Sequence, residues 1–319
     1  MARLSCLRFA GRDRIPGTGI ITRTLGNKVH DIAQMGFAND NVDKYNRGRP
    51  GYDLTSLEMI DKLLQRSWDL KDESRRIVEL GAGTGKFTKD FLANYPKYRF
   101  NYMATEPSSA FRRSLLENLG TGDNFQAVEG YGESVPVPSH SVSGVLIAQA
   151  FHWMANETTL RELHRILRPN TPVICVWNAQ SRVNPWQAAL EFDIISPHYP
   201  ADTPRQQDYR WRDVFCDPSQ NSAARDLFQS AGYDALSPNG GGGFRIGEHA
   251  FTRSITSSAQ TIVDRALSVS VIACQPPDVQ AAVERQVREL LRTHPDTRDI
   301  TDDQYRVDIL TELAWVYAK

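Results

Sequence analysis

The stretch Glu79-Leu80-Gly81-Ala82-Gly83-Thr84-Gly85-Lys86-Phe87-Thr88 decides the fold. It follows a short β-like run that begins at Ile77, and the residues after it carry apolar side chains at helical spacing. A GxGxG segment between a strand and a helix lets the backbone approach a ligand without interference from Cβ atoms. The helix that follows offers free N–H groups and the positive end of its dipole, which favour a carboxylate.

Two other kinds of glycine-rich loop do not match this stretch. A P-loop needs a Gly, four residues and then Gly-Lys-Ser/Thr, but Leu80 holds the first position and Phe87 the last. A dinucleotide fingerprint needs GxGxxG, and Lys86 stands where the third glycine belongs. An acid near the end of the next strand, Glu106, follows Gly85 by 21 residues, which is close to the spacing of a carboxylate that binds ribose. The pattern predicts a site for a ligand with an amino-acid part and a nucleoside, and the alternative is an ordinary tight turn with a surface Glu.

Strand-like and helix-like segments alternate over residues 75–178. This pattern predicts an α/β protein with a Rossmann-like, doubly wound, mostly parallel sheet of seven strands and a C-terminal cap region. The expected strands are 77–80, 100–105, 125–128, 142–150, 173–177 and one near 310–316. The expected helices are 54–66, 108–118, 257–268 and 277–292, one after the glycine loop and one over 160–167. Between 180 and 250 the chain is rich in Pro, Asn, Ser, Asp and Gly, and the regular alternation stops.

Composition narrows the classes of partner and compartment. Lys and Arg number 37 against 38 Asp and Glu, so no overall field attracts nucleic acid, and no run of 18 apolar residues predicts a membrane span. The four cysteines form no CxxC pair, which favours a reducing compartment without a zinc site. We expect a cytoplasmic monomer or homodimer that takes a small-molecule substrate, with no nucleic acid, membrane or metal partner. The Arg-rich, acid-poor residues 1–30 are typical of a mitochondrial transit peptide, and the alternative is a disordered extension or a mispredicted start.

Several segments resemble the class I S-adenosylmethionine-dependent methyltransferases. Besides the glycine loop, residues 142–153 look like the fourth-strand motif of a small-molecule branch, as do residues 163–169 and the strand after them, which ends in Val176-Trp177-Asn178. The upstream Tyr45 with Arg49-Pro50-Gly51-Tyr52, and the late strand with Trp315, are similar to the branch that contains the trans-aconitate methyltransferases. The resemblance covers about residues 37–319 and is strongest over 75–178.

The resemblance implies a cofactor, S-adenosyl-L-methionine, and roles for individual residues. The implied cofactor-binding residues are Glu79, Gly81, Ala82, Gly83, Gly85, Glu106, Pro107, Tyr131, Gly132, Glu133, Gln149, Ala150 and Phe151. The three glycines would carry the methionyl part and Glu106 the ribose, while the segment at Tyr131 would contact adenine and the segment at Gln149 would lie beside the sulfonium. The implied substrate-binding residues are Tyr45, Arg49, Tyr52 and Trp153.

The chain is expected to divide into four parts. Residues 1–36 form an extension that is disordered or carries a targeting signal, residues 37–74 form an N-terminal flap and helix, residues 75–178 bind the cofactor, and residues 179–319 supply the substrate cap and the final strands. Two departures from the family pattern stand out. Ser143 replaces an Asp that is frequent in the fourth strand, and Asn170-Thr171 replaces the usual Gly-Gly, which puts the geometry of that turn in doubt.

Methyl transfer from a sulfonium is an in-line displacement, so the protein mainly aligns the reactants and excludes water. His152 is the candidate general base, since imidazole titrates near neutrality, and the alternative is a structural His packed beside Trp153. A carboxylate acceptor would need no base. Arg49 and Arg182 are candidate clamps for an acidic substrate, with a solvated surface arginine as the alternative for each.

We therefore expect a methyltransferase that acts on a small organic molecule at a carboxylate or hydroxyl oxygen. The alternative is a catalytically inactive, cofactor-binding pseudoenzyme or scaffold, which the two departures keep open. An NAD-dependent oxidoreductase is disfavoured because the third glycine of GxGxxG is missing.

Overall fold

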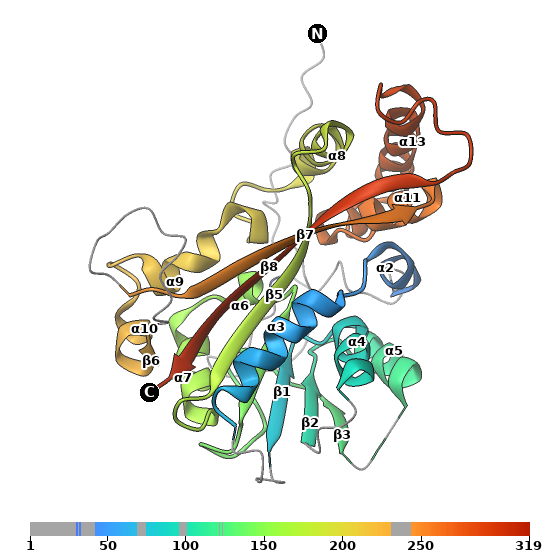
Figure 1. Ribbon diagram of the computed structural model, residues 1–319. Coiled ribbons are helices and arrows are strands. Elements are labelled where there is room, and N and C mark those ends of the chain that lie inside the picture. Colours follow the sequence, from blue (N-terminus) through green and yellow to red (C-terminus); the bar gives the residue numbers. More distant parts are fainter. Residues whose placement is uncertain are drawn as a thin grey trace, which may run out of the picture.

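The computed structural model describes residues 42–68, 75–95, 101–120, 124–230 and 244–319, together with residues 30, 32 and 122. In this part of the chain a central sheet carries helices on both faces, and a group of helices stands above one end of the sheet (Figure 1). The expected N-terminal extension, 1–36, lies outside the described residues except for His30 and Ile32.

The bounds of the elements are close to those expected over the first half of the chain. The strands are β1 (Arg76–Leu80), β2 (Asn101–Thr105), β3 (Phe125–Val128), β4 (Gly144–Ala148), β5 (Pro172–Gln180), β6 (Phe228–Gln229), β7 (Gly247–Ser257) and β8 (Tyr305–Ala318). The helices that flank them are α3 (Leu54–Gln65), α4 (Lys86–Asn94), α5 (Ser109–Leu119), α6 (Phe151–Met154), α7 (Glu157–Ile166), α9 (Asp213–Cys216) and α10 (Ser222–Leu227). The flap helix is α2 (Val42–Gly48), and the cap holds α8 (Pro185–Ala189), η2 (Leu190–Ile195), η3 (Ser196–His198), α11 (Ala259–Leu267), α12 (Ser270–Ala273) and α13 (Pro277–Thr293). Two short turns, η4 (Gln206–Asp208) and η5 (Arg210–Arg212), precede α9.

The sheet order is β3-β2-β1-β4-β5-β8-β6, and β7 also pairs with β8. The strands β1 to β5 run parallel, whereas β8 is antiparallel to β5, β6 and β7. Because parallel strands end at one edge, the segments after β1, β2, β4 and β5 lie together. The chain order reverses between β1 and β4, which is where α/β proteins bind their ligands.

The sheet is buried on both faces, because its side chains alternate between two hydrophobic clusters. In β4, Val145 and Ile147 pack with α7, α9 and α10, whereas Leu146 and Ala148 pack with α3, α4 and α5. A strand with apolar residues at every position satisfies both faces at once. The helix α3 begins after Asp53, whose Oδ1 accepts a hydrogen bond from the Ser56 N–H at 2.9 Å.

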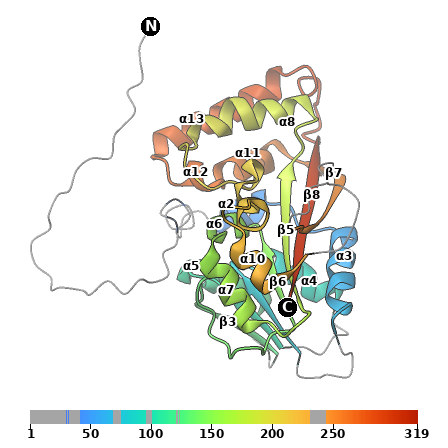
Figure 2. The ribbon, with the colours of Figure 1, turned by 90° about the vertical axis from the view of Figure 1, so that its left-hand side faces the viewer.

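A third hydrophobic cluster forms the cap above the carboxyl ends of the strands (Figure 2). It joins α8, η2, α11, α12 and α13 to the first residues of β8, including Tyr305, Val307 and Ile309. The expected apolar stripe of 277–292 belongs to this core, since Val283 and Val287 are fully buried in α13. The strand β8 continues from the cap into the main sheet. Its first residues therefore pack in the cap, and its later residues pack in the core of the sheet.

The sheet differs from the expected seven strands in two places. Within the described residues it has eight strands, because β6 and β7 both pair with β8. The strand β7 was not expected, since its exposed positions other than Ala250 are polar and Arg253 interrupts its inner row. The turn at 169–171 is well formed, because Asn170 adopts φ 63° and asparagine tolerates this left-handed conformation. No helix in the described part of the chain is long and apolar enough to cross a membrane.

Candidate active site

The glycine loop has the backbone that its composition predicts. Gly81, Gly83 and Gly85 adopt φ values of 66°, 60° and 80°. A Cβ at Gly81 would lie 2.7 Å from the Cβ of Ala150, which is closer than packed atoms allow. Among the described residues a Cβ at Gly83 would meet only Phe111, at 3.8 Å, so these residues leave the space above Gly83 open. The loop therefore needs glycine, and it leaves room for a ligand over Gly83.

Glu79 lies at the end of β1 with its side chain fully buried. Its Oε2 accepts hydrogen bonds from the Thr88 hydroxyl at 2.6 Å and the Tyr102 hydroxyl at 2.7 Å. Desolvation raises the pKa of Glu79 to about 7, although the two hydroxyls oppose this shift. Its Oε1 is buried and accepts no hydrogen bond from the described residues, so this atom can accept one from a ligand ammonium or backbone donor.

Glu106 ties the glycine loop to the end of β2. Its Oε2 accepts the Gly83 N–H at 3.0 Å, and its Oε1 accepts the Ser108 N–H at 2.8 Å. Burial raises the pKa of Glu106, while the two backbone donors lower it. Each carboxylate oxygen can accept a further hydrogen bond, so Glu106 is placed to hold the hydroxyls of a ribose beside Gly83. Pro107 follows it, and its carbonyl accepts a hydrogen bond from Arg112 at 2.8 Å.

The segment expected to contact adenine lies between β3 and β4. The Tyr131 hydroxyl donates to Glu129 at 2.9 Å, and Glu133 accepts from the Asn156 amide at 2.9 Å. A Cβ at Gly132 would lie 2.9 Å from Met154, so this loop packs closely against α6. The structure thus places all three residues near the same edge of the sheet as the glycine loop, but none of them lines the cavities described below.

Gln149 follows β4 in a strained conformation, with φ 59°. Its N–H donates to the Val176 carbonyl at 2.8 Å, and its side-chain amide donates to the Asn178 carbonyl at 3.0 Å. These bonds fix Gln149 at the tip of the strand. The next two side chains point to different surroundings. Ala150 contacts the glycine loop, whereas the Phe151 ring is fully buried and stacks on the Phe215 ring with 5.5 Å between the centroids. The core therefore holds the Phe151 ring, and the placement of Phe151 beside the sulfonium stays a prediction.

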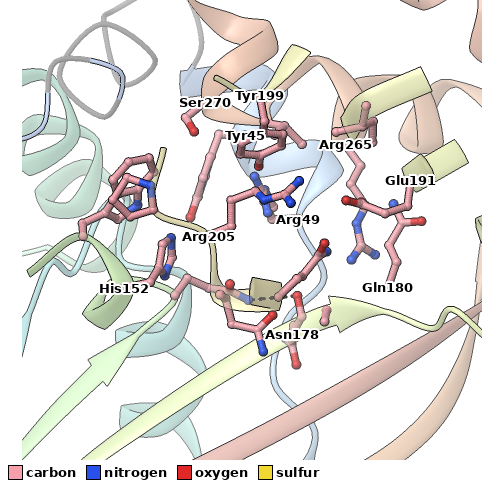
Figure 3. A pocket seen from close by; sticks show the side chains of 18 residues that line it. Tyr45, Arg49, His152, Asn178, Gln180, Glu191, Tyr199, Arg205, Arg265 and Ser270 are labelled. Carbon is pink, nitrogen blue, oxygen red and sulfur yellow. Dashed lines mark hydrogen bonds between the residues drawn. The ribbon is translucent and has the colours of Figure 1, made fainter. Parts of the chain in front are cut away.

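Three neighbouring cavities lie between the strand ends, the flap and the cap. The glycine-loop cavity, about 30 Å³, is lined by Tyr45, Arg49, Pro50, Tyr52, Gly81, Ala82, Lys86, Phe87, Ala148 and Gln149. The central cavity, about 110 Å³, is shown in Figure 3 with its labelled residues Tyr45, Arg49, His152, Asn178, Gln180, Glu191, Tyr199, Arg205, Arg265 and Ser270. Gln149 and Trp153 also line the central cavity. The rear cavity, about 200 Å³, lies between α2, β7, α8 and α11.

The flap closes over the glycine loop through specific contacts. The Lys86 ammonium in α4 donates to the Asn46 carbonyl at 2.7 Å, and the Tyr52 N–H donates to Asp90 at 2.7 Å. The Arg49 guanidinium donates to the hydroxyl and carbonyl of Ser268 at 3.2 and 3.3 Å. The structure therefore brings all three predicted flap residues, Tyr45, Arg49 and Tyr52, to the glycine-loop cavity.

His152 points into the central cavity from α6 (Figure 3). Its Nδ1 accepts a hydrogen bond from the buried Trp177 indole at 3.3 Å, which assigns the ring proton to Nε2. Desolvation and the nearby Arg49 lower the pKa of His152 to about 3. The imidazole is therefore neutral near pH 7, and its free edge presents a hydrogen-bond donor rather than the basic nitrogen that we expected.

Much of the central cavity comes from residues that no motif marks. Gln180 lies on β5, Glu191 on η2, and Arg205 and Arg265 in the cap, while Asn178 on β5 belongs to the strand end quoted above. A wide π-helical turn presents Glu191, and such turns are frequent at functional sites. The other candidate clamp, Arg182, lies outside these cavities, where it donates to Gln207 and stacks on Phe192. Within the described residues, no cluster of His, Cys, Asp or Glu could hold a metal ion.

Comparisons with known proteins agree with this geometry. Residues 78–175 match the family described as methyltransferase domain. An uncharacterized methyltransferase-like protein of Schizosaccharomyces pombe is 32% identical over 179 residues, which are 56% of this chain and 64% of that protein. A malonyl-(acyl-carrier protein) O-methyltransferase of Halalkalibacterium halodurans is 29% identical over 116 residues, 35% of this chain and 42% of that protein. The matches thus span less than two thirds of either relative.

A solved structure agrees with the fold. A protein from Anaeromyxobacter dehalogenans, described as a type II methyltransferase, superposes with a TM-score of 0.53 and 15% identity, covering 84% of this chain and 96% of that one. At this identity the likeness concerns the fold alone. The expected resemblance and the Rossmann-like architecture are confirmed, while the branch within the family stays a prediction.

Proposed function

We propose that this chain, whose residues 78–175 form a methyltransferase domain, transfers a methyl group from S-adenosylmethionine to an oxygen of a small organic molecule. One observation carries the proposal. Tyr45, Arg49 and Gln149 line both the glycine-loop cavity and the central cavity, so the two spaces adjoin at the end of β4. A donor over the glycines and an acceptor in the central cavity would therefore meet beside Gln149.

The residues around the glycine loop suit S-adenosylmethionine. Glu79 Oε1 is available for the ammonium, the open side of Gly83 for the methionyl part, and Glu106 for the ribose. The glycine-loop cavity of about 30 Å³ is smaller than a nucleoside, so we expect the flap to move when the donor binds. The contacts of Lys86 with Asn46 and of Arg49 with Ser268 would then reform over the bound donor and exclude water.

The bound donor supplies an electrophilic methyl group on a positively charged sulfur. An acceptor oxygen forms the new bond to this carbon while the carbon–sulfur bond breaks and sulfur keeps the electron pair. A carboxylate acceptor loses no proton in this step, whereas a hydroxyl acceptor must. The neutral His152, with its proton on Nε2, can orient an acceptor oxygen by donating a hydrogen bond, which favours a carboxylate. The O-methyltransferase relative supports methylation at oxygen.

The test is incubation of the protein with methyl-labelled S-adenosylmethionine and a panel of carboxylic acids and their corresponding alcohols. We expect label in a methyl ester and S-adenosylhomocysteine in equal amount. Tight donor binding without label in any acceptor, or in the protein, would favour the pseudoenzyme instead. A protein that binds no donor would contradict both.

A further inference from the structure

Arg265 is a buried cation whose guanidinium has no hydrogen-bond partner among the described residues. It lies in α11 with 7% of its surface exposed. No described residue forms a hydrogen bond or ion pair with its guanidinium, although Glu191 is close enough to influence its pKa. Burial and the neighbouring Arg49 lower the pKa of Arg265 to about 9, so the group stays charged near neutral pH. A buried charge is costly unless an anion compensates it, and Glu191 lies nearby without forming a hydrogen bond to it, so a ligand anion can complete the compensation.

The packing of α2 on α11 holds a second cation beside Arg265. A Cβ at Gly48 would lie 2.3 Å from the Arg265 backbone nitrogen, so the two helices cross in direct contact. The Arg47 guanidinium donates to Asp264 at 2.7 Å and fixes this crossing. As a result Arg49, the next residue after the crossing, lines the same two cavities as Arg265.

The central cavity therefore has an excess of positive charge. Three arginines line it, and the one lining carboxylate is Glu191, whose Oε1 accepts a hydrogen bond from Ser196 at 3.2 Å. Arg205 is neutralised by Asp208, at 2.7 and 3.0 Å. His152 is neutral. Arg49 and Arg265 thus face a single carboxylate.

Arg265 also stands in the wall between the central and rear cavities. Both cavities are lined by Arg49, Gln180 and Arg265. Figure 3 shows Arg265 beside Glu191 and Gln180, on the side of the central cavity away from His152. Beyond this wall the apolar residues that line the rear cavity come from the flap, the cap, β7 and β8, namely Pro50, Trp186, Leu190, Ile255, Ile262 and Val307. Polar side chains line another part of the rear cavity, namely Arg47, Thr256, Ser257 and Thr261.

We propose that Arg265 and Arg49 bind a carboxylate of the acceptor at this wall, and that the rear cavity receives an apolar arm of the same molecule. The acceptor class is then an amphiphilic carboxylic acid whose methylated oxygen lies apart from the anchored carboxylate, near Gln149 and His152. The assignment rests on the proposed function, because it concerns the acceptor side of that reaction. This carboxylate would explain why the buried Arg265 guanidinium, which no described residue pairs, lies between the central and the rear cavity.

The probe for this site is octanoate, titrated calorimetrically into the protein saturated with S-adenosylhomocysteine. We expect octanoate to bind at least about tenfold more tightly than octanamide, which lacks the charge, and than butanoate, which lacks the arm. Arg265→Gln should remove the preference for octanoate over octanamide, and Arg265→Lys should retain part of it. Ile255→Trp, which fills the rear cavity, should weaken octanoate but leave butanoate unchanged. The control is Arg285→Gln, at an exposed position of α13.

Each result decides a part of the proposal. Equal binding of octanoate and octanamide, or an unchanged octanoate affinity in Arg265→Gln, would overturn the anion site. Equal binding of octanoate and butanoate would overturn the apolar arm. Because Arg265 is unpaired, Arg265→Gln should fold with a melting temperature no lower than that of the wild type, which separates lost binding from lost structure. Failure of the protein to bind S-adenosylhomocysteine would count against the proposed function alone, since the octanoate titrations can be run without it.

Discussion

The substitution Gly81→Ala tests the glycine loop, and Gly120→Ala serves as its control. Gly81 and Gly120 both have positive φ angles, 66° and 75°, and Gly120 combines its φ with a ψ of −171°. Alanine at such sparsely populated backbone positions costs about 1–3 kcal/mol. At Gly120 no described residue lies within 4 Å of the added Cβ, whereas at Gly81 the Cβ of Ala150 is 2.7 Å away. Overpacking of this kind costs about 1–3 kcal/mol more.

We therefore expect Gly81→Ala to lower the free energy of unfolding by about 2–6 kcal/mol and Gly120→Ala by about 1–3 kcal/mol. Chemical denaturation followed by circular dichroism measures both values. A calorimetric titration with S-adenosylmethionine provides the second readout, in which Gly81→Ala should bind far more weakly and Gly120→Ala as the wild type. Equal losses of stability, together with normal donor binding by Gly81→Ala, would refute the assignment of a crowded cofactor loop.

Three further predictions concern single side chains. Because burial raises the pKa of Glu79 from 4.5 to about 7, the native state keeps a proton that the unfolded chain loses, so the free energy of unfolding should fall by roughly 3 kcal/mol between these pH values. Glu79→Gln should flatten that slope in denaturation curves, and an unchanged slope would contradict the buried carboxyl. Since the pKa of His152 is lowered to about 3, the pH profile of the methyl-transfer rate should contain no step near pH 6.5 that depends on His152. A step near pH 6.5 that is present in the wild type and absent in His152→Gln would restore His152 as a base. Gly48→Ala should separate α2 from α11 and lower the melting temperature by several degrees, and an unchanged melting curve would show that the crossing is loose.

The strands β1 to β5 and the helices α3, α4, α5 and α7 could be predicted because each leaves a local signal, whereas the short helices α2 and α6 were not expected. Strand β4 is apolar at every position, and α3 has an apolar stripe and a capping Asp53. The strand β7 leaves no such signal, since its pairing with β8 stabilises it rather than burial of its own side chains. The expectation of seven strands was wrong for a similar reason. The two-residue strand β6 has no sequence pattern of its own and is defined by its pairing with β8.

The candidate site likewise contains residues that could be predicted from the sequence and residues that could not. Gly81, Glu106 and Gln149 could be predicted because they belong to a continuous strand–loop–helix pattern. Arg265 and Glu191 could not, since their place in the central cavity depends on how the cap packs on α2 and β8. The sequence also cannot reveal the orientation of a ring, and so the core position of Phe151 and the neutral state of His152 emerge only from the structure.

Calorimetric titration of the wild-type protein with S-adenosylmethionine, NAD and ATP tests the central claim most directly. We expect one site per chain for S-adenosylmethionine, competition by S-adenosylhomocysteine, and no heat from NAD or ATP. Binding of NAD or ATP with comparable affinity, or no binding of S-adenosylmethionine, would contradict the assignment of the glycine loop and Glu106 to this donor.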